Sequence, residues 1–272
     1  MQQHVSKFGG NPSHVTIWGE SAGAGSVLNQ ILANGGNTPK ALGLKQPLFQ
    51  AAIGSSVFLP TQVAYNAPIA EEIYHGLADF VGCGNLSSQG SFACLQAKDA
   101  ATVAAAALNL SKAAPTGYWT YVPVIEGQGG FLQERASLLL AKGSKNLNGV
   151  SFLRAVAPRK GRRLTFFFPS RALAPQLKFL GINNQDEGYI FTDSSIINDT
   201  TTDATQLGNQ FNKLLAGLFP LFTAEQIQSV AAQYPISDAP STGNTFNRIS
   251  NIIADSTFVC PVSLEFGRGV TM

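Results

Sequence analysis

The sequence predicts an α/β fold in which helices flank a parallel sheet. Short β-branched or aromatic runs alternate with longer segments whose apolar residues recur at helical spacing. The chain has 272 residues, of which 44% are hydrophobic and 12% are charged, as is typical of a globular protein with a substantial core. No apolar run is as long as a membrane span, and a net charge of +2 does not by itself indicate a polyanionic partner.

The first predicted strand covers residues 15–18, a β-branched and aromatic run that ends at Gly19. A helix is expected over residues 22–32, because Val27, Leu28, Ile31 and Leu32 recur at helical spacing before two glycines. Residues 49–56 form the second predicted strand. This strand–helix–strand order is typical of a parallel sheet.

Further along the chain, residues 69–81 have one apolar helical face, and residues 121–127 are strand-like but end in turn residues. A third strand is predicted over residues 179–184. Two helices follow it: the first has an apolar stripe through residues 207–218. Thr223 and Gln226 form a capping box for the second, which Pro235 ends.

The segment Gly19-Glu20-Ser21-Ala22-Gly23 joins the first strand to its helix within a few residues. A serine in this setting predicts a nucleophile elbow, in which a strained turn exposes the hydroxyl and the flanking glycines avoid collisions. The Ala22 amide, at the helix N-terminus, would then face a developing oxyanion. The alternative is an ordinary strand–helix turn with a solvated serine.

The stretch from Phe8 to Gln30 resembles the nucleophile region of the type B carboxylesterase/lipase family of α/β-hydrolases. The resemblance extends over most of residues 1–150 and 181–262. It implies that Ser21 is the nucleophile, that Ala22 is the oxyanion donor of the elbow, and that Glu187 is the triad acid. Asp186 is the neighbouring alternative acid. No cofactor or metal is implied.

The sequence departs from this family in its histidines. In this fold the triad follows the chain order serine, acid, histidine, so a catalytic histidine is expected after Glu187. The three histidines, His4, His14 and His75, all precede it. The family's glycine-rich oxyanion loop lies upstream of Met1. We therefore expect a single partial α/β-hydrolase domain over residues 1–272, lacking N-terminal strands and the histidine segment, with residues 15–19 at an open sheet edge.

Residues 151–180 match nothing in the family and hold seven basic residues and no acidic one, so the rest of the chain is net acidic. A nucleic-acid or heparin patch is one interpretation. The segment has no sustained period and mixes arginine, proline and a Phe166–Phe168 run, which favours a foreign insertion such as translated non-coding sequence. We expect no nucleic-acid partner.

The cysteines favour an oxidising compartment. Cys83 and Cys94 flank a short loop that a disulfide could close, and the pair resembles a family disulfide. Cys260 is left over, either as a buried thiol or with a partner outside this chain. Sequons at Asn85, Asn109 and Asn198 also fit a secreted glycoprotein, although the chain begins without a signal peptide.

The resemblance implies a carboxylic ester hydrolase that forms an acyl-enzyme on Ser21 with a small-molecule or lipid ester. A catalytically silent fragment, or a relative used for binding or adhesion, is the competing interpretation.

Overall fold

The computed structural model describes residues 1–115, 117–141, 147–148, 151–154, 177–184, 186–198, 204–235 and 244–263. The chain divides into two compact units. The first comprises Met1–Pro60, Ile125–Thr202 and Tyr234–Met272, and the second comprises Thr61–Val124 and Asp203–Gln233. No helix in the described ranges is long and apolar enough to cross a membrane.

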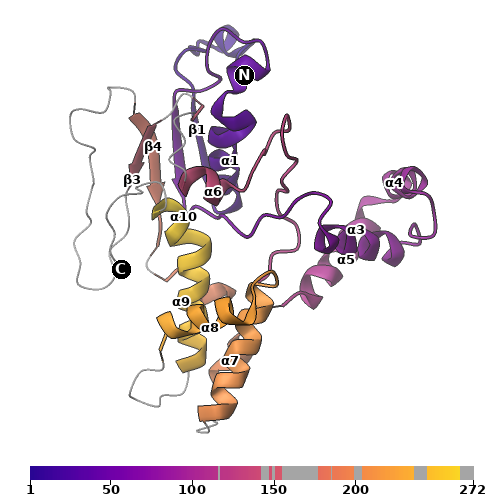
Figure 1. Ribbon diagram of the computed structural model, residues 1–272. Helices are drawn as coiled ribbons and strands as arrows, with labels where there is room; N and C mark the ends of the chain where they lie inside the picture. The colour runs from indigo at the N-terminus through magenta and orange to yellow at the C-terminus, as the bar shows by residue number, and fades with distance from the viewer. Residues whose placement is uncertain are drawn as a thin grey trace. The chain divides into compact units, whose positions relative to one another are not determined.

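A parallel sheet forms the centre of the first unit, as predicted (Figure 1). Its strands are β1 (Thr16–Glu20), β2 (Ala51–Ser55), β3 (Ser151–Arg154) and β4 (Leu177–Ile182), in the order β1-β2-β4-β3. Thus β2 pairs with β1 on one side and with β4 on the other. The predicted insertion contributes β3 and the start of β4, while its residues 155–176, with most of the basic cluster, lie outside the described residues.

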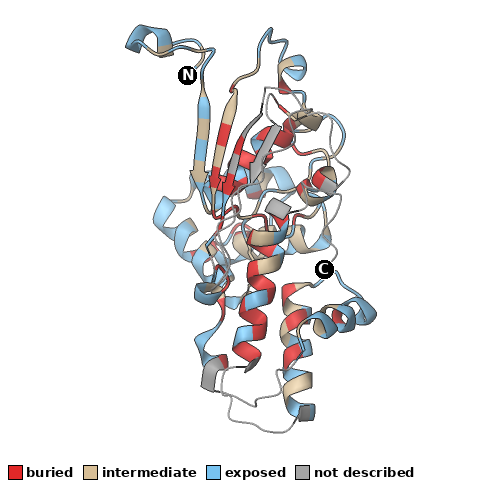
Figure 2. Cartoon of the chain, turned by 90° about the vertical axis from the view of Figure 1, so that its left-hand side faces the viewer, coloured by how far each residue is buried: buried red, intermediate tan, exposed pale blue. Residues whose placement is uncertain are grey.

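The strand β1 lies at one end of this sheet and, among the described residues, pairs only with β2. Its residues alternate between exposed and half-buried, and Figure 2 shows no buried position along it, in contrast to β2. Trp18 is 71% exposed, and its indole N–H donates to Ser55 Oγ at 3.3 Å. The expectation of an open edge at this strand is therefore confirmed for the described part of the sheet.

The helix α1 (Ala22–Gly36) packs on β1 and β2. Its buried residues meet Phe49, Ala52 and Phe179 in the core of the first unit. Regular helical dihedral angles stop after Leu32: Ala33 is extended, and Asn34 and Gly35 have positive φ. The predicted helix end at this position is confirmed.

Asn148 holds this chain reversal in place from inside the protein. Its side-chain amide donates to the carbonyls of Gln30 and Ala33, each at 2.9 Å, and to Thr38 Oγ1 at 2.8 Å. Its Oδ1 accepts from the Thr38 N–H at 2.6 Å. This one side chain, 4% exposed, therefore satisfies the end of α1 and the start of α2 (Thr38–Ala41).

The remaining helices of the first unit are short, apart from one near the C-terminal end. They are η1 (Val5–Phe8), α6 (Ala136–Ala141), η2 (Tyr189–Phe191), η3 (Ser194–Asn198), α9 (Asn244–Ile253), the π-helix η4 (Ala254–Val259) and α10 (Cys260–Ser263). The predicted strand-like segment 121–127 forms no strand. Pro123 cannot donate to a ladder, and the chain turns at residues 127–130, with the Glu126 N–H bonded to the Leu132 carbonyl at 2.8 Å.

The second unit is helical. It contains α3 (Pro68–Phe80), α4 (Ser88–Ala97), α5 (Ala100–Ala113), α7 (Ala204–Leu218) and α8 (Ala224–Gln233). The predicted capping box is confirmed: the Thr223 N–H donates to Gln226 Oε1 at 2.9 Å, and the Gln226 N–H donates to Thr223 Oγ1 at 3.3 Å. Hydrogen bonds from Thr102 likewise cap α5 at Asp99 and lower the pKa of that carboxyl.

A disulfide joins Cys83 to Cys94, as the sequence led us to expect, with the two Cα atoms 5.7 Å apart. It ties the end of α3 to α4, and Cys83 is fully buried with Ala78 and Ala106 in a small apolar cluster. Cys260 is exposed, so of the two alternatives for this residue the buried thiol is excluded.

We predict that Asn148→Leu lowers the free energy of unfolding by about 1–3 kcal/mol, because it leaves the Thr38 N–H and two helix carbonyls buried without a partner. Urea denaturation followed by circular dichroism measures the change. The matched control is Asn251→Leu on the exposed side of α9. Equal stability of the two variants would contradict the assigned role.

Removing the disulfide with Cys83→Ala and Cys94→Ala is expected to cost roughly 3 kcal/mol of stability, because the short loop is no longer closed in the unfolded chain. Dithiothreitol should cause a similar loss in the unchanged protein and none in the double variant. A similar loss in the double variant on reduction would count against this disulfide as its source.

Candidate active site

Three parallel strands end together at one edge of the sheet. Glu20 of β1 lies opposite Ser55 of β2, and Ser55 lies opposite Ile182 of β4. The segments that follow these strands contain Ser21, Ser56 and the loop to Glu187. Ligand sites in open α/β sheets form at this carboxyl edge, so the register brings the predicted site residues to the right side of the sheet.

Ser21 occupies the sharp turn between β1 and α1. Its φ of 55° and ψ of −121° lie in a region that residues other than glycine rarely adopt and that costs about 1–3 kcal/mol. Two backbone hydrogen bonds hold it there: its N–H donates to the Ser55 carbonyl at 2.9 Å, and its carbonyl accepts from the Gly25 N–H at 3.0 Å. The predicted strained elbow is therefore present.

Gly19 and Gly23 contribute unequally to this turn. A Cβ on Gly19 would lie 2.2 Å from the Gly23 carbonyl oxygen, so the strand passes too close to the helix for any other residue. A Cβ on Gly23 would meet nothing within 4 Å. The expectation that both glycines avoid side-chain collisions is therefore wrong for Gly23. A side chain at Gly23 would have room, and it is the Gly23 carbonyl that excludes a side chain at Gly19.

The Ser21 hydroxyl is available to a ligand. The residue is half-buried, and its side chain makes no capping hydrogen bond to α1. Ala22 is exposed and begins the helix, so its N–H belongs to the first turn, whose amides have no intrahelical acceptor. Glu20 is exposed as well. A hydroxyl beside a free helix amide is the arrangement an oxyanion-forming reaction needs.

The two candidate acids differ in their surroundings. Glu187 is 8% exposed, and its Oε1 accepts from the Asn184 N–H at 2.6 Å. Asp186 is exposed. Glu187 therefore lies inside the protein at the carboxyl edge of the sheet, where an acid could orient a base, whereas Asp186 faces solvent.

The loop before Glu187 contains polar residues for which the sequence motifs predict no role. Asn184 Nδ2 donates to Ser56 Oγ at 3.1 Å, and Ser56 has a φ of 52° directly after β2. Asn183 is 1% exposed; its Oδ1 accepts from the Val57 N–H at 3.3 Å, and its Nδ2 donates to the Phe258 carbonyl at 2.8 Å. In the sequence, the pair of asparagines at the end of the predicted strand 179–184 was the one feature that could have indicated these contacts.

The C-terminal helices support this loop from behind. A Cβ on Gly188 would lie 1.8 Å from the Ser250 carbonyl oxygen, so the chain after Glu187 touches the backbone of α9. Phe191 stacks on Phe258 of η4 with ring centres 5.5 Å apart. The Thr257 carbonyl also accepts from the Leu59 N–H at 2.9 Å. The π-helix thus joins the segments that follow β2 and β4.

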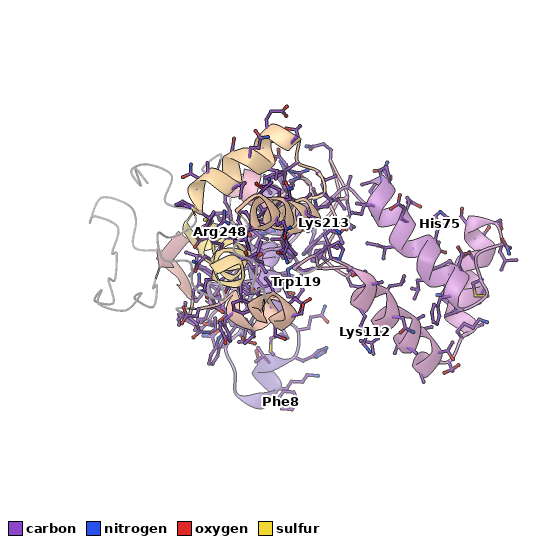
Figure 3. All side chains as sticks on the ribbon, turned by 90° about the horizontal axis from the view of Figure 1, so that it is seen from below. Phe8, His75, Lys112, Trp119, Lys213 and Arg248 are labelled. Carbon is purple, nitrogen blue, oxygen red and sulfur yellow. A yellow bond between two sulfur atoms is a disulfide. The ribbon has the colours of Figure 1, made fainter. Side chains whose placement is uncertain are left out.

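None of the three histidines is among the residues that the described structure places at this edge. His14 is exposed and bonded to Asn11 at 2.8 Å, and His4 is exposed before η1. His75 lies on α3 in the second unit, with its side chain 65% exposed and 3.9 Å from Glu71, and is labelled in Figure 3. No hydrogen bond or ion pair joins any of them to Ser21 or Glu187 in the part of the chain that the structure describes. The side chain of His75 therefore faces solvent.

A metal site is not indicated by the described side chains. Among them, no three histidine, cysteine, aspartate or glutamate residues lie close enough to hold an ion. The residues placed at this edge provide a hydroxyl, a helix amide and a buried carboxyl group.

Comparison with known proteins gives similarity to fungal esterases and lipases. Lipase 4 of Diutina rugosa is 40% identical over 94 residues, which cover 34% of this chain and 16% of the relative. Secreted lipase 4 of Gibberella zeae is 25% identical over 276 residues, which cover 96% of this chain and 41% of the relative. This chain thus spans less than half the length of each.

Among solved structures, EstA of Aspergillus niger superposes with a TM-score of 0.65 at 22% identity, covering 97% of this chain and 42% of EstA. At this identity the match shows the fold, which agrees with the parallel sheet and the strand–helix elbow described above. The model of the carboxylesterase family matches residues 1–267, and the chain therefore belongs to that family.

Proposed function

We propose that this protein is a carboxylic ester hydrolase in which Ser21 is the nucleophile. The observation that carries the proposal is the strained backbone of Ser21 at the junction of β1 and α1, with its hydroxyl free of capping bonds. Family membership supports the same chemistry. Small-molecule or lipid esters are the proposed substrates.

In the proposed reaction, Ser21 Oγ adds to the carbonyl carbon of the ester, and the Ala22 N–H donates to the oxyanion. The ester C–O bond then breaks, the alcohol leaves with the proton of the serine hydroxyl, and an acyl-Ser21 ester remains. Water adds to that ester, releases the acid and restores the hydroxyl. Glu187 is proposed to orient the group that accepts the proton.

The rate of the proposed reaction depends on a base that accepts the proton of the Ser21 hydroxyl. A histidine does this work in serine triads, and none of the three histidines of this chain contacts Ser21 or Glu187 in the described structure. Loss of the base costs on the order of a million-fold in turnover in a serine protease. We therefore expect acylation of Ser21 to be detectable and turnover to be very slow.

The position of the histidines favours a second candidate, a catalytically silent relative that binds ligands or partners without turnover. This candidate expects no reaction at Ser21 at all. Reactivity of the serine in folded protein therefore separates the two.

An extracellular location is also proposed. The Cys83–Cys94 disulfide fits an oxidising compartment, and a relative is a secreted lipase. The sequon residues Asn85 and Asn109 are exposed, as glycan acceptors must be, while the side chain of Asn198 lies outside the described residues.

We predict that a fluorophosphonate probe labels Ser21 in the folded protein, because the elbow exposes the hydroxyl beside the Ala22 amide. Peptide mass spectrometry locates the label, and p-nitrophenyl butyrate measures turnover. Ser21→Ala should abolish labelling, whereas His14→Ala and His75→Ala should leave it unchanged. Absence of label from folded protein would support the silent relative instead.

Two glycine substitutions test the elbow itself. Gly19→Ala should reduce labelling of Ser21 and cost about 1–3 kcal/mol of stability, because its Cβ meets the Gly23 carbonyl. Gly23→Ala should preserve labelling and should not reduce stability, because its Cβ meets nothing. Labelling rates and urea denaturation measure both effects, and equal behaviour of the two variants would refute the close approach.

A further inference from the structure

The second unit contains a cavity of about 490 Å³ that is separate from the residues of the candidate active site. Its walls are one face of α3, residues 118 and 120–124, and two residues before α3. This volume is within the range of about 300–1,000 Å³ that is typical of small-molecule sites. A ligand of moderate size would therefore fit within this unit alone.

The walls of the cavity are uncharged. Ala70, Ile73 and Leu77 line it from one side of α3, and Val122, Pro123 and Val124 line it from the other segment. None of the lining residues is acidic or basic. A charged ligand would lose water there without gaining a counter-charge, so this lining selects a neutral, apolar molecule.

A threonine at the wall has a buried hydroxyl group without a hydrogen-bond partner among the described residues. Tyr74 is already committed, because its hydroxyl donates to Ser91 Oγ at 3.1 Å. Thr120 Oγ1 is enclosed and has no hydrogen-bond partner among the described residues, a situation that costs about 1–3 kcal/mol. Rotation of its side chain to another staggered position would present the hydroxyl to a ligand oxygen.

Two tyrosines add neutral donors to the same wall. Burial raises the pKa of Tyr118, and the nearby Glu72 raises it further. Burial also raises the pKa of Tyr121. Both phenols therefore keep their protons at neutral pH, and they add hydrogen-bond donors without adding charge. Trp119 lies between Tyr118 and Thr120 in the sequence and is labelled in Figure 3.

We propose that this cavity binds a neutral, apolar small molecule that carries a single carbonyl or hydroxyl oxygen. The apolar body lies against Ala70, Ile73 and Leu77 of α3, and the oxygen bonds to the hydroxyl of Thr120. This site takes part in no step proposed for Ser21.

Benzophenone is a suitable probe because it has two apolar rings and one carbonyl oxygen, and ultraviolet light attaches it to nearby C–H bonds. We expect the label to fall within residues 61–77 and 118–124. Binding is measured by quenching of Trp119 fluorescence in a Trp18→Phe background, which leaves Trp119 as the single tryptophan of the two in the sequence.

The main variant is Ala70→Phe, which fills the cavity and should weaken benzophenone binding roughly tenfold or more. The matched control is Ala101→Phe, on an exposed position of α5 that does not line the cavity, and it should leave binding unchanged. Circular dichroism confirms that both variants fold.

A second variant tests the hydrogen bond without filling the cavity. Thr120→Val should weaken benzophenone binding about three- to tenfold and leave diphenylmethane, which lacks the carbonyl, unaffected. Label spread along the chain, equal binding by the two phenylalanine variants, or equal losses for the two probes would overturn the proposal. Because no ester is used, these outcomes are independent of the reactivity of Ser21.

Discussion

The candidate active site depends on the pairing of β2 with a strand on each side. Through this pairing the Ser55 carbonyl accepts the N–H of Ser21, while Ser56, the next residue, accepts a hydrogen bond from Asn184. The Asn184 N–H then donates to Glu187. Because parallel strands in register end at one edge, two residues that are far apart in the sequence are linked by three hydrogen bonds and one peptide unit.

Backbone crowding is the second constraint on this site. Gly19 must lack a side chain because the Gly23 carbonyl lies where its Cβ would be, and Gly188 must lack one because of the Ser250 carbonyl. One close approach positions the serine turn and the other positions the acid loop. The strain at Ser21 persists because the sheet and α1 fix both sides of the turn. Close packing of the main chain therefore positions the site residues more than contacts among their side chains do.

Some buried polar side chains bond to the backbone and do not face a ligand. Asn148 and Asn183 each satisfy backbone groups at chain reversals that secondary structure leaves without partners. In contrast, Thr120 has an enclosed hydroxyl without a partner among the described residues. The hydrogen bonds of Asn148 and Asn183 explain why these side chains are buried. Thr120 lies at the wall of an uncharged cavity, where a ligand would supply its missing hydrogen-bond partner.

The sequence by itself determined the parallel α/β class, the strand–serine–helix junction, the end of α1 near Gly35 and the Thr223 capping box, because each depends on residues a few positions apart. It could not show that Glu187 is buried while Asp186 faces solvent, place Ser56 or Asn183, show that only Gly19 needs to be glycine at the elbow, or exclude a strand at 121–127. Those outcomes required the tertiary structure, because burial, close backbone approach and pairing between distant strands are set by segments that the local pattern does not contain.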